Sequence, residues 1–78
     1  MRLDGNSILI ADPDYDFSDQ LKNSLSHLGA NCFQADDLDE AKLLLVKHDF
    51  DIIISNYYLS DGIIHELIDW CSKNLESL

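Results

Sequence analysis

Basic residues are scarce in this sequence. Five Lys and Arg stand against 15 Asp and Glu, so the 78 residues carry a formal net charge of -10. Nucleic acids and anionic membranes are bound through clusters of Lys and Arg. The basic residues here are scattered and form no stripe: Arg2, Lys22, Lys42, Lys47 and Lys73. We therefore expect neither a nucleic-acid partner nor a membrane partner, and we interpret most of the acids as a solvated surface.

Cysteine and long apolar runs are also limited. Cys32 and Cys71 lie far apart, each inside an apolar pattern. They lack the C-x-x-C spacing of redox and zinc sites, and we interpret them as reduced core thiols. No run approaches the roughly 18 apolar residues of a membrane helix, and residues 1–5 lack the apolar core of a signal peptide. The expected compartment is the cytoplasm, and the length allows one domain with a marginal core.

Short apolar runs alternate with amphipathic stretches along the chain. The runs are typical of strands and are predicted at 7–11, 30–35 and 50–55. The amphipathic stretches predict helices at 14–28, 38–48 and 62–75. Because the connections are short, this order requires an α/β fold with a parallel sheet and right-handed crossovers. The strands then end on one edge of the sheet, together with Asp12, Asp36 and Asn56.

Each predicted helix has an apolar stripe that should face the sheet. The stripes are Phe17, Leu21, Leu25 and Leu28 in the first helix, Leu38, Ala41, Leu44 and Leu45 in the second, and Ile64, Leu67, Ile68, Cys71 and Leu75 in the third. Local signals mark the helix ends. Asp37 and Glu40 have the spacing of a capping box, and Gly29 is suited to end the first helix. His48 is interpreted as a cap on free carbonyls at the end of the second helix.

Four motifs resemble the receiver domains of bacterial response regulators. They are I-L-I-A-D-P-D, the spacing from Asp12 to H-L-G at 27–29, D-D-L-D-E-A, and D-I-I-I-S-N-Y-Y-L-S-D-G at 51–62, which is similar to the phosphoacceptor loop. The resemblance implies one truncated pseudo-receiver domain over residues 1–78. Its fold would be flavodoxin-like, with a three-stranded parallel sheet in the order 2-1-3 and three helices.

The departures from the family pattern concern its chemistry. In the acidic pair that helps to hold Mg²⁺, Asp12 matches the first member and the second falls on Pro13. The phosphoacceptor aspartate corresponds to Asn56, yet phosphoryl transfer in this family needs a carboxylate and a divalent ion. The family's switch Ser/Thr and Lys would lie beyond the third helix. We therefore expect no enzyme activity and no cofactor, with Asn56 as a degenerate phosphoacceptor position and Asp12 and Asp14 as a residual acidic pocket.

Two other interpretations concern the same acids. Asp12, Asp14 and Asn56 together offer oxygens suited to weak Mg²⁺ binding. We favour the view that Asp14 caps the first helix. The stretch I-L-I-A-D-P-D also fits the hhhhDxD motif of haloacid-dehalogenase-like phosphatases, with Asp12 as nucleophile and Asp14 as acid/base. Such enzymes need a downstream Lys and a second acidic pair in a larger domain, which disfavours this alternative.

The third strand is left at an open edge if the chain ends after three βα units. Ile52, Ile53 and Ile54 would then form a template for pairing. We predict a homodimer through the third strands or the third helices. Phe17, Tyr57 and Tyr58 are candidate interface residues for a histidine kinase, a phosphotransfer protein or another receiver. An alternative is that the chain is the dimerisation piece of a larger signalling protein.

Overall fold

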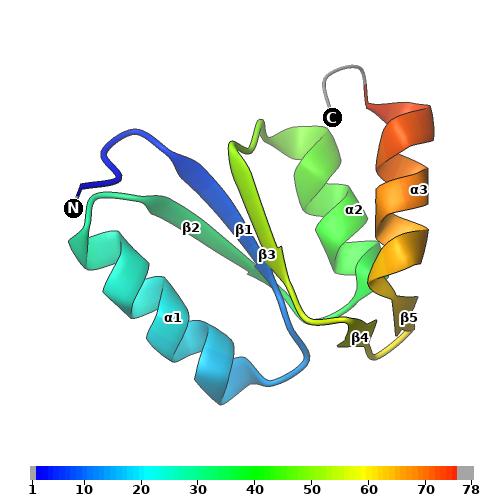
Figure 1. The fold of residues 1–78 in the computed structure, drawn as a ribbon, viewed down its shortest axis with the longest axis horizontal. Helices are drawn as coiled ribbons and strands as arrows, with labels where there is room; N and C mark the ends of the chain where they lie inside the picture. The colour runs from blue at the N-terminus through cyan, green and yellow to red at the C-terminus, as the bar shows by residue number, and fades with distance from the viewer. Residues whose placement is uncertain (1, 76–78) are drawn as a thin grey trace.

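The computed structural model describes residues 2–75, in which helices cover both faces of one parallel sheet (Figure 1). The order of elements is β1 (Ser7–Ala11), α1 (Tyr15–His27), β2 (Asn31–Ala35), α2 (Leu38–Lys47), β3 (Ile52–Ser55), β4 (Tyr58–Leu59), β5 (Gly62–Ile63) and α3 (Ile64–Asn74). The main sheet has the order β2-β1-β3. One face packs on α1 and the other on α2 and α3, which confirms the predicted α/β architecture.

The central strand β1 carries the core on both faces. Ile8 pairs with Cys32 of β2 and with Ile52 of β3, so β1 has a parallel neighbour on each side. Leu9 and Ala11 pack into the cluster under α2 and α3, whereas Ile8 and Ile10 pack under α1. All four side chains are at most 1% exposed. This is why the first strand appears in the sequence as an uninterrupted apolar run.

Short-range capping fixes the starts of α1 and α2. Asp14 accepts a hydrogen bond from the backbone N–H of Phe17 at 3.1 Å, and Asp37 accepts one from Glu40 at 2.8 Å. Gly29 follows α1 with φ of 98°, a left-handed conformation that favours glycine. His48 is the C-cap of α2, as expected. Its backbone N–H bonds the carbonyl of Leu44, while its ring packs against Phe33 with centroids 4.6 Å apart.

The buried face of α1 differs from the predicted stripe. Phe17 is 51% exposed, and Ser18 is buried beside it in the sequence at 1% exposure. The Ser18 hydroxyl accepts a 3.0 Å hydrogen bond from Nε2 of Gln34 on β2 and donates to the carbonyl of Tyr15. Because successive helical residues are about 100° apart, burying Ser18 with Leu21 and Leu25 turns Phe17 outward.

The segment before α3 also departs from the prediction. In place of a loop and a helix from residue 62, Tyr58 pairs with Ile63 and Leu59 with Gly62 in the antiparallel β4–β5 hairpin. Leu59 is 7% exposed and anchors this hairpin in the core cluster. A Cβ on Gly62 would clash first with the Glu66 carboxylate and would lie 2.6 Å from Cδ1 of Leu38, so a larger residue here would have to displace both side-chain ends.

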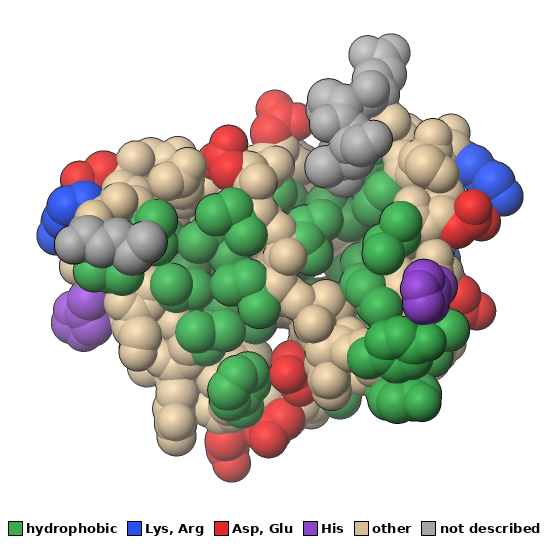
Figure 2. Space-filling model, viewed as in Figure 1, with side chains coloured by type: hydrophobic (Ala, Val, Ile, Leu, Met, Phe, Trp, Pro, Cys, Tyr) green, Lys and Arg blue, Asp and Glu red, His purple; other side chains and the backbone are tan. Residues whose placement is uncertain are grey.

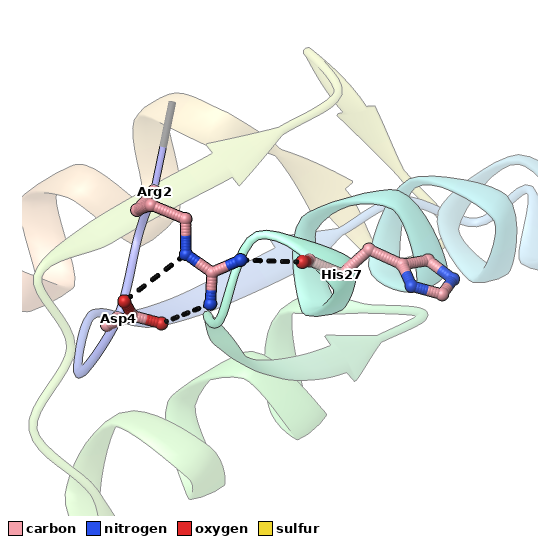
Figure 3. Close-up of polar contacts among 3 residues, drawn as sticks. All are labelled: Arg2, Asp4 and His27. Carbon is pink, nitrogen blue, oxygen red and sulfur yellow. Dashed lines mark hydrogen bonds and ion pairs between the residues drawn. The ribbon is translucent and has the colours of Figure 1, made fainter.

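The N-terminal segment is fastened to the end of α1 (Figure 3). The Arg2 guanidinium lies 2.9 and 3.3 Å from the Asp4 carboxylate and 3.5 Å from the carbonyl of His27. The backbone N–H of Leu3 donates to the carbonyl of Leu28 at 2.6 Å. Exposed ion pairs contribute at most about 1 kcal/mol, so the backbone bond and Leu3 packing under α1 are the firmer attachment.

The outer edge of β3 has no strand beside it among the described residues. This edge lies toward the viewer in Figure 1. The same view in Figure 2 shows hydrophobic side chains gathered on both sides of a tan band of backbone and other side chains. Two exposed residues belong to this side of the molecule. Ile52 is 41% exposed, and Ile68, which we predicted to be in the core, is 58% exposed. The packing of α3 against β3 is therefore incomplete.

Candidate functional site

The carboxyl ends of β1 and β3 bring Asp12 and Asn56 together, as the parallel topology requires. The backbone N–H of Asn56 donates to the carbonyl of Ala11 at 2.9 Å, and that of Asp12 donates to Ala35 at 3.0 Å. Both residues line an open hollow of about 300 Å³. The remaining lining residues are Ile10, Ala11, Phe17, Ile54 and Ser55. Ligands of open α/β sheets bind at this edge, which makes the hollow the candidate site.

One side-chain oxygen of Asp12 and one of Asn56 accept hydrogen bonds within local turns. Asp12 Oδ1 accepts a hydrogen bond from the N–H of Asp14 at 2.8 Å, and Asn56 Oδ1 accepts one from the N–H of Tyr57 at 2.9 Å. Asp14 caps α1 through the N–H of Phe17 and does not line the hollow. Asp12 and Asn56 therefore lie in the same hollow, whereas Asp14 caps the start of α1.

The donor set does not fit a receiver-type magnesium centre. Hard cations such as Mg²⁺ take several oxygen ligands in a near-octahedral arrangement. Here the hollow offers one carboxylate, from Asp12, and one amide, from Asn56, while Pro13 supplies no side-chain oxygen. Over residues 2–75, no group of three or more His, Cys, Asp or Glu side chains is arranged to hold a metal ion.

The hollow also lacks the groups that the phosphatase alternative needs. Its lining contains a single carboxylate, Asp12, and no lysine among the described residues. Asp14, the acid/base of that alternative, is held by its capping bond outside the lining. A carboxylate nucleophile is activated by a neighbouring base, a cation or a metal. No observation at this site favours haloacid-dehalogenase-like chemistry.

Asp61 has a role that the sequence analysis did not assign. Its carboxylate accepts a hydrogen bond from the N–H of Leu38 at 2.6 Å and one from Asp39 at 3.2 Å. These donors are the free N–H groups at the start of α2. The hydrogen bond from the N–H of Leu38 is the main cause that lowers the pKa of Asp61. Desolvation opposes this shift, and the hydrogen bond from Asp39 and the charge of Lys42 reinforce it. Acids are favoured at a helix N-terminus, but the sequence does not show that the loop carrying Asp61 lies beside the start of α2.

Exposed aromatic side chains surround the end of β3. Tyr57 is 46% exposed and Tyr58 is 67% exposed, and their rings meet edge to face with centroids 4.9 Å apart. His65 of α3 completes this cluster, with its Nδ1 3.4 Å from the Tyr57 hydroxyl. Phe17 lies across the chain on α1, in the lining of the Asn56 hollow. All three candidate interface aromatics are thus accessible at the carboxyl edge of the sheet, with Phe17 on the α1 side and Tyr57 beside α3.

Comparison with known proteins gives structural neighbours only. No family model and no curated protein sequence matches the chain. The non-phosphorylated HemR receiver domain from Leptospira biflexa superposes with a TM-score of 0.84 and is 25% identical. The signal receiver domain of an HD domain-containing protein from Pseudomonas fluorescens Pf-5 has a TM-score of 0.81 and 23% identity. The fold is that of a receiver domain.

The receiver comparison covers nearly all of this chain but not all of its neighbours. The alignments include 94% and 96% of the chain and 59% and 55% of the HemR and Pseudomonas receiver domains, respectively. The chain has the β2-β1-β3 sheet and the three helices of a flavodoxin-like fold, and the neighbours are larger. A receiver fold indicates a signal-transduction module. Within residues 2–75, the structure contains no helix of the length and apolarity needed to cross a bilayer.

Proposed function

We propose that this chain is a pseudo-receiver that acts in bacterial signal transduction by binding other proteins and does not accept a phosphoryl group. The observation that carries this proposal is Asn56 beside Asp12 at the end of β3. An acyl phosphate forms on a carboxylate oxygen, and the delocalised amide of asparagine is no substitute for that nucleophile. The same amide oxygen is held by the N–H of Tyr57.

A phosphorylation assay tests the chemical half of this proposal. The protein is incubated with acetyl phosphate and Mg²⁺, and its intact mass is measured under conditions that preserve acyl phosphates. We expect no mass increase of one phosphoryl group on the unaltered chain. Asn56→Asp is the matched comparison because it restores the carboxylate at the same backbone position. A covalent phosphoryl group on the unaltered chain would refute the proposal.

The exposed aromatics support a binding role at the carboxyl edge of the sheet. Phe17 lines the hollow, and Tyr57 and Tyr58 extend from the adjoining loop with 46% and 67% of their surfaces accessible. Exposed aromatic residues often anchor protein partners. The proposed partner that contacts these aromatic residues is a histidine kinase, a phosphotransfer protein or another receiver. Such a partner would be bound without phosphoryl transfer to this chain.

Charge substitutions test this binding surface. Purified kinases, phosphotransfer proteins and receivers from the same source are titrated against the chain by biolayer interferometry. Phe17→Asp and Tyr57→Asp should each weaken a genuine interaction by tenfold or more, about 1.4 kcal/mol, because an aspartate replaces an apolar anchor. Leu43→Asp is the control, since Leu43 is 60% exposed on α2. Equal binding by all variants would remove Phe17 and Tyr57 from the interface.

We further propose that the chain is a homodimer closed through β3 or α3. The support is the absence of a strand outside β3 in the described chain and the 58% exposure of Ile68 on α3. An open edge with apolar side chains beside it is a template for association. If the chain is one piece of a larger signalling protein, this edge is its dimerisation element. Light scattering after size-exclusion chromatography at micromolar concentration tests the homodimer, and a stable monomer would refute it.

A further inference from the structure

The hydrogen bonds of the sheet determine which backbone groups of β3 face outward. Asn31 donates to the carbonyl of Asn6, and Asp12 donates to Ala35, so residues 8, 10 and 12 of the first strand direct their N–H groups to β2. In a parallel ladder the alternate residues 7, 9 and 11 face β3. The bond from the Asn56 N–H to the Ala11 carbonyl agrees with this phase.

The same alternation continues along β3. With Ala11 opposite Ser55 in the register and Asn56 bonded inward, Ile52 and Ile54 also direct their backbone groups to β1. Ile53 and Ser55 then present their N–H and C=O groups to the outer edge. Among the described residues, no further strand pairs with these groups. The edge therefore offers two donors and two acceptors in a fixed order.

Apolar side chains lie on both sides of this row of backbone groups. On the α3 face there is a groove of about 370 Å³. It is lined by Ile53, Ser55, Ile64, Leu67, Ile68, Cys71 and Ser72. On the α1 face, Ile52 is 41% exposed beside the partly buried Ile54. A strand added at this edge would bury apolar surface on both faces and would satisfy the outward backbone groups.

We propose that the added strand is β3 of a second copy, antiparallel, with the two-fold axis normal to the sheet at Ile54. This inference rests on the homodimer of the proposed function and specifies its geometry. A two-fold axis normal to the sheet keeps the α1 layers on one side and the α3 layers on the other. Residues directly opposite each other in an antiparallel pair have their side chains on the same face of the sheet. An axis between two residues would pair consecutive residues, whose side chains point to opposite faces, so the axis must pass through a residue that pairs with its own copy.

The axis at Ile54 uses every outward backbone group. It pairs Ile53 with the partner's Ser55 and Ser55 with the partner's Ile53, and each pair exchanges two hydrogen bonds. An axis at Ile53 would place Ser55 opposite the partner's Asp51. The N–H of Asp51 already donates to Ser7, so one carbonyl of each Ser55 would stay unpaired. The Ile54 axis is preferred because four bonds form and none of these groups is left over.

The hydrogen-bonding pattern of the edge supports a second copy as the occupant, because a two-fold pairing of β3 with itself matches each outward N–H with a C=O of the partner strand. A self-complementary strand edge is what an isologous two-fold contact requires. Ile68 and the α3 groove would be covered near the axis.

The net negative charge of the two copies opposes dimerisation, but the β3 edge itself adds little repulsion. The net charge of -10 on each copy gives a general repulsion that salt screens. Within the strand and its first flanking residues, Asp51 is the one acid, and its carboxylate accepts a 2.8 Å hydrogen bond from the N–H of Ser7. Raising the NaCl concentration from about 0.05 to 0.5 M should therefore increase the dimer fraction.

Cysteine cross-linking tests the register directly. The background is Cys32→Ser with Cys71→Ala, checked for folding by circular dichroism and for dimerisation by light scattering. At an axis on Ile54 the two Cα atoms of that non-hydrogen-bonded pair are about 4.5 Å apart, within disulfide range. Ile54→Cys should form a disulfide dimer under mild oxidation. Ile52→Cys is the control, because its two copies would lie about 13 Å apart along the strands, beyond disulfide reach.

The outcomes separate the register from the dimer itself. A monomeric unaltered chain would refute both. A dimer in which Ile53→Cys cross-links to itself and Ile54→Cys does not would overturn the register alone. If the cysteine-free background does not fold, Ser55→Pro in the native background replaces the test. Its lost N–H faces outward, so the fold should persist and the dimer should dissociate at least tenfold more readily. An unchanged dimer with Ser55→Pro would overturn the register.

Discussion

The carboxylate of Asp61 and the backbone N–H of Leu38 are joined by a hydrogen bond of 2.6 Å, across 23 residues of sequence. A second bond, from the N–H of Asp39, reaches the other carboxylate oxygen. Asp37, which directly precedes α2, caps the same helix by accepting a hydrogen bond from the N–H of Glu40. The start of α2 is thus capped twice, once locally and once by the loop that follows β3. The hydrogen bonds of Asp61 thus attach the segment that follows β3 to the start of α2.

Stability should fall at acidic pH in a way that depends on Asp61. The folded pKa of Asp61 is lowered chiefly by the Leu38 hydrogen bond, so its stabilising effect is complete above the unfolded value near 3.9. The effect is lost as the pH falls through the lower folded pKa. Asp61→Asn should therefore be less stable than the unaltered chain at neutral pH and approach it in acid. Urea unfolding as a function of pH measures this.

Asp36→Asn is the control for the Asp61 experiment. Asp36 is another exposed acid at the carboxyl edge of the sheet, beside β2. Its substitution should leave the acid dependence of unfolding unchanged relative to the unaltered chain. If Asp61→Asn and the unaltered chain differ by the same free energy at every pH, the hydrogen bonds to α2 are not made by an ionised carboxylate.

Asn56→Asp should strengthen Mg²⁺ binding at the end of β3. The substitution adds one negative charge beside Asp12 in the hollow of about 300 Å³. A unit charge about 4 Å from a divalent ion in water contributes about 2 kcal/mol, so an increase in affinity of tenfold or more is expected. Isothermal titration calorimetry with MgCl₂ measures it. Ser60→Asp, which adds the same charge at an exposed position outside the hollow, is the control and should raise the affinity less. An unchanged affinity for Asn56→Asp would contradict the geometry.

Phe17→Ala should be much less harmful to stability than a core substitution. Phe17 is 51% exposed, so about half of the 1.5–3 kcal/mol of a fully buried side chain is at stake, about 1 kcal/mol. Leu67 is 1% exposed, and Leu67→Ala should cost 2–5 kcal/mol. Chemical denaturation of both variants gives the comparison. A loss of more than about 3 kcal/mol for Phe17→Ala would place this side chain in the core after all.

Ser18 and Gln34 should be coupled across the α1–β2 contact. Ser18→Ala leaves Nε2 of Gln34 without its 3.0 Å acceptor in a partly buried position, at a cost of about 1–2 kcal/mol. Gln34→Leu in the Ser18→Ala background should recover part of that loss. The double-mutant cycle should therefore give a coupling of about 1 kcal/mol. Ser24→Ala, at an exposed position of α1, is the control and should change stability by less than about 0.5 kcal/mol.

Much of the fold follows from short-range patterns. The strand at 7–11 has the predicted bounds, and Asp14, Asp37 and Gly29 mark the helix ends as expected. The parallel order also predicts that Asp12 and Asn56 share the carboxyl edge. These features depend on local backbone chemistry and on the handedness of βαβ units, both of which are written in consecutive residues.

Other features depend on groups that are distant in the sequence. Apolar spacing favours Phe17 as a core residue, but Gln34 on β2 needs a polar partner and Ser18 supplies it. The β4–β5 hairpin forms where Gly62 packs against Leu38, and the sequence around 58–63 has too few residues to signal two strands. Ile68 belongs to the predicted stripe yet is exposed, because no strand covers the α3 groove within residues 2–75.

The sequence by itself determined the order of the three helices and of the strands of the main sheet, the chemistry of Asn56 and the acidic surface, since each depends on residue type and local spacing. Tertiary structure alone decided that Asp61 caps α2, that Phe17 faces solvent, and that Ile53 and Ser55 direct free backbone groups outward. These outcomes depend on the phase of a helix or strand relative to its neighbours. That phase is set when distant polar groups and apolar faces are satisfied together, which no single stretch of sequence specifies.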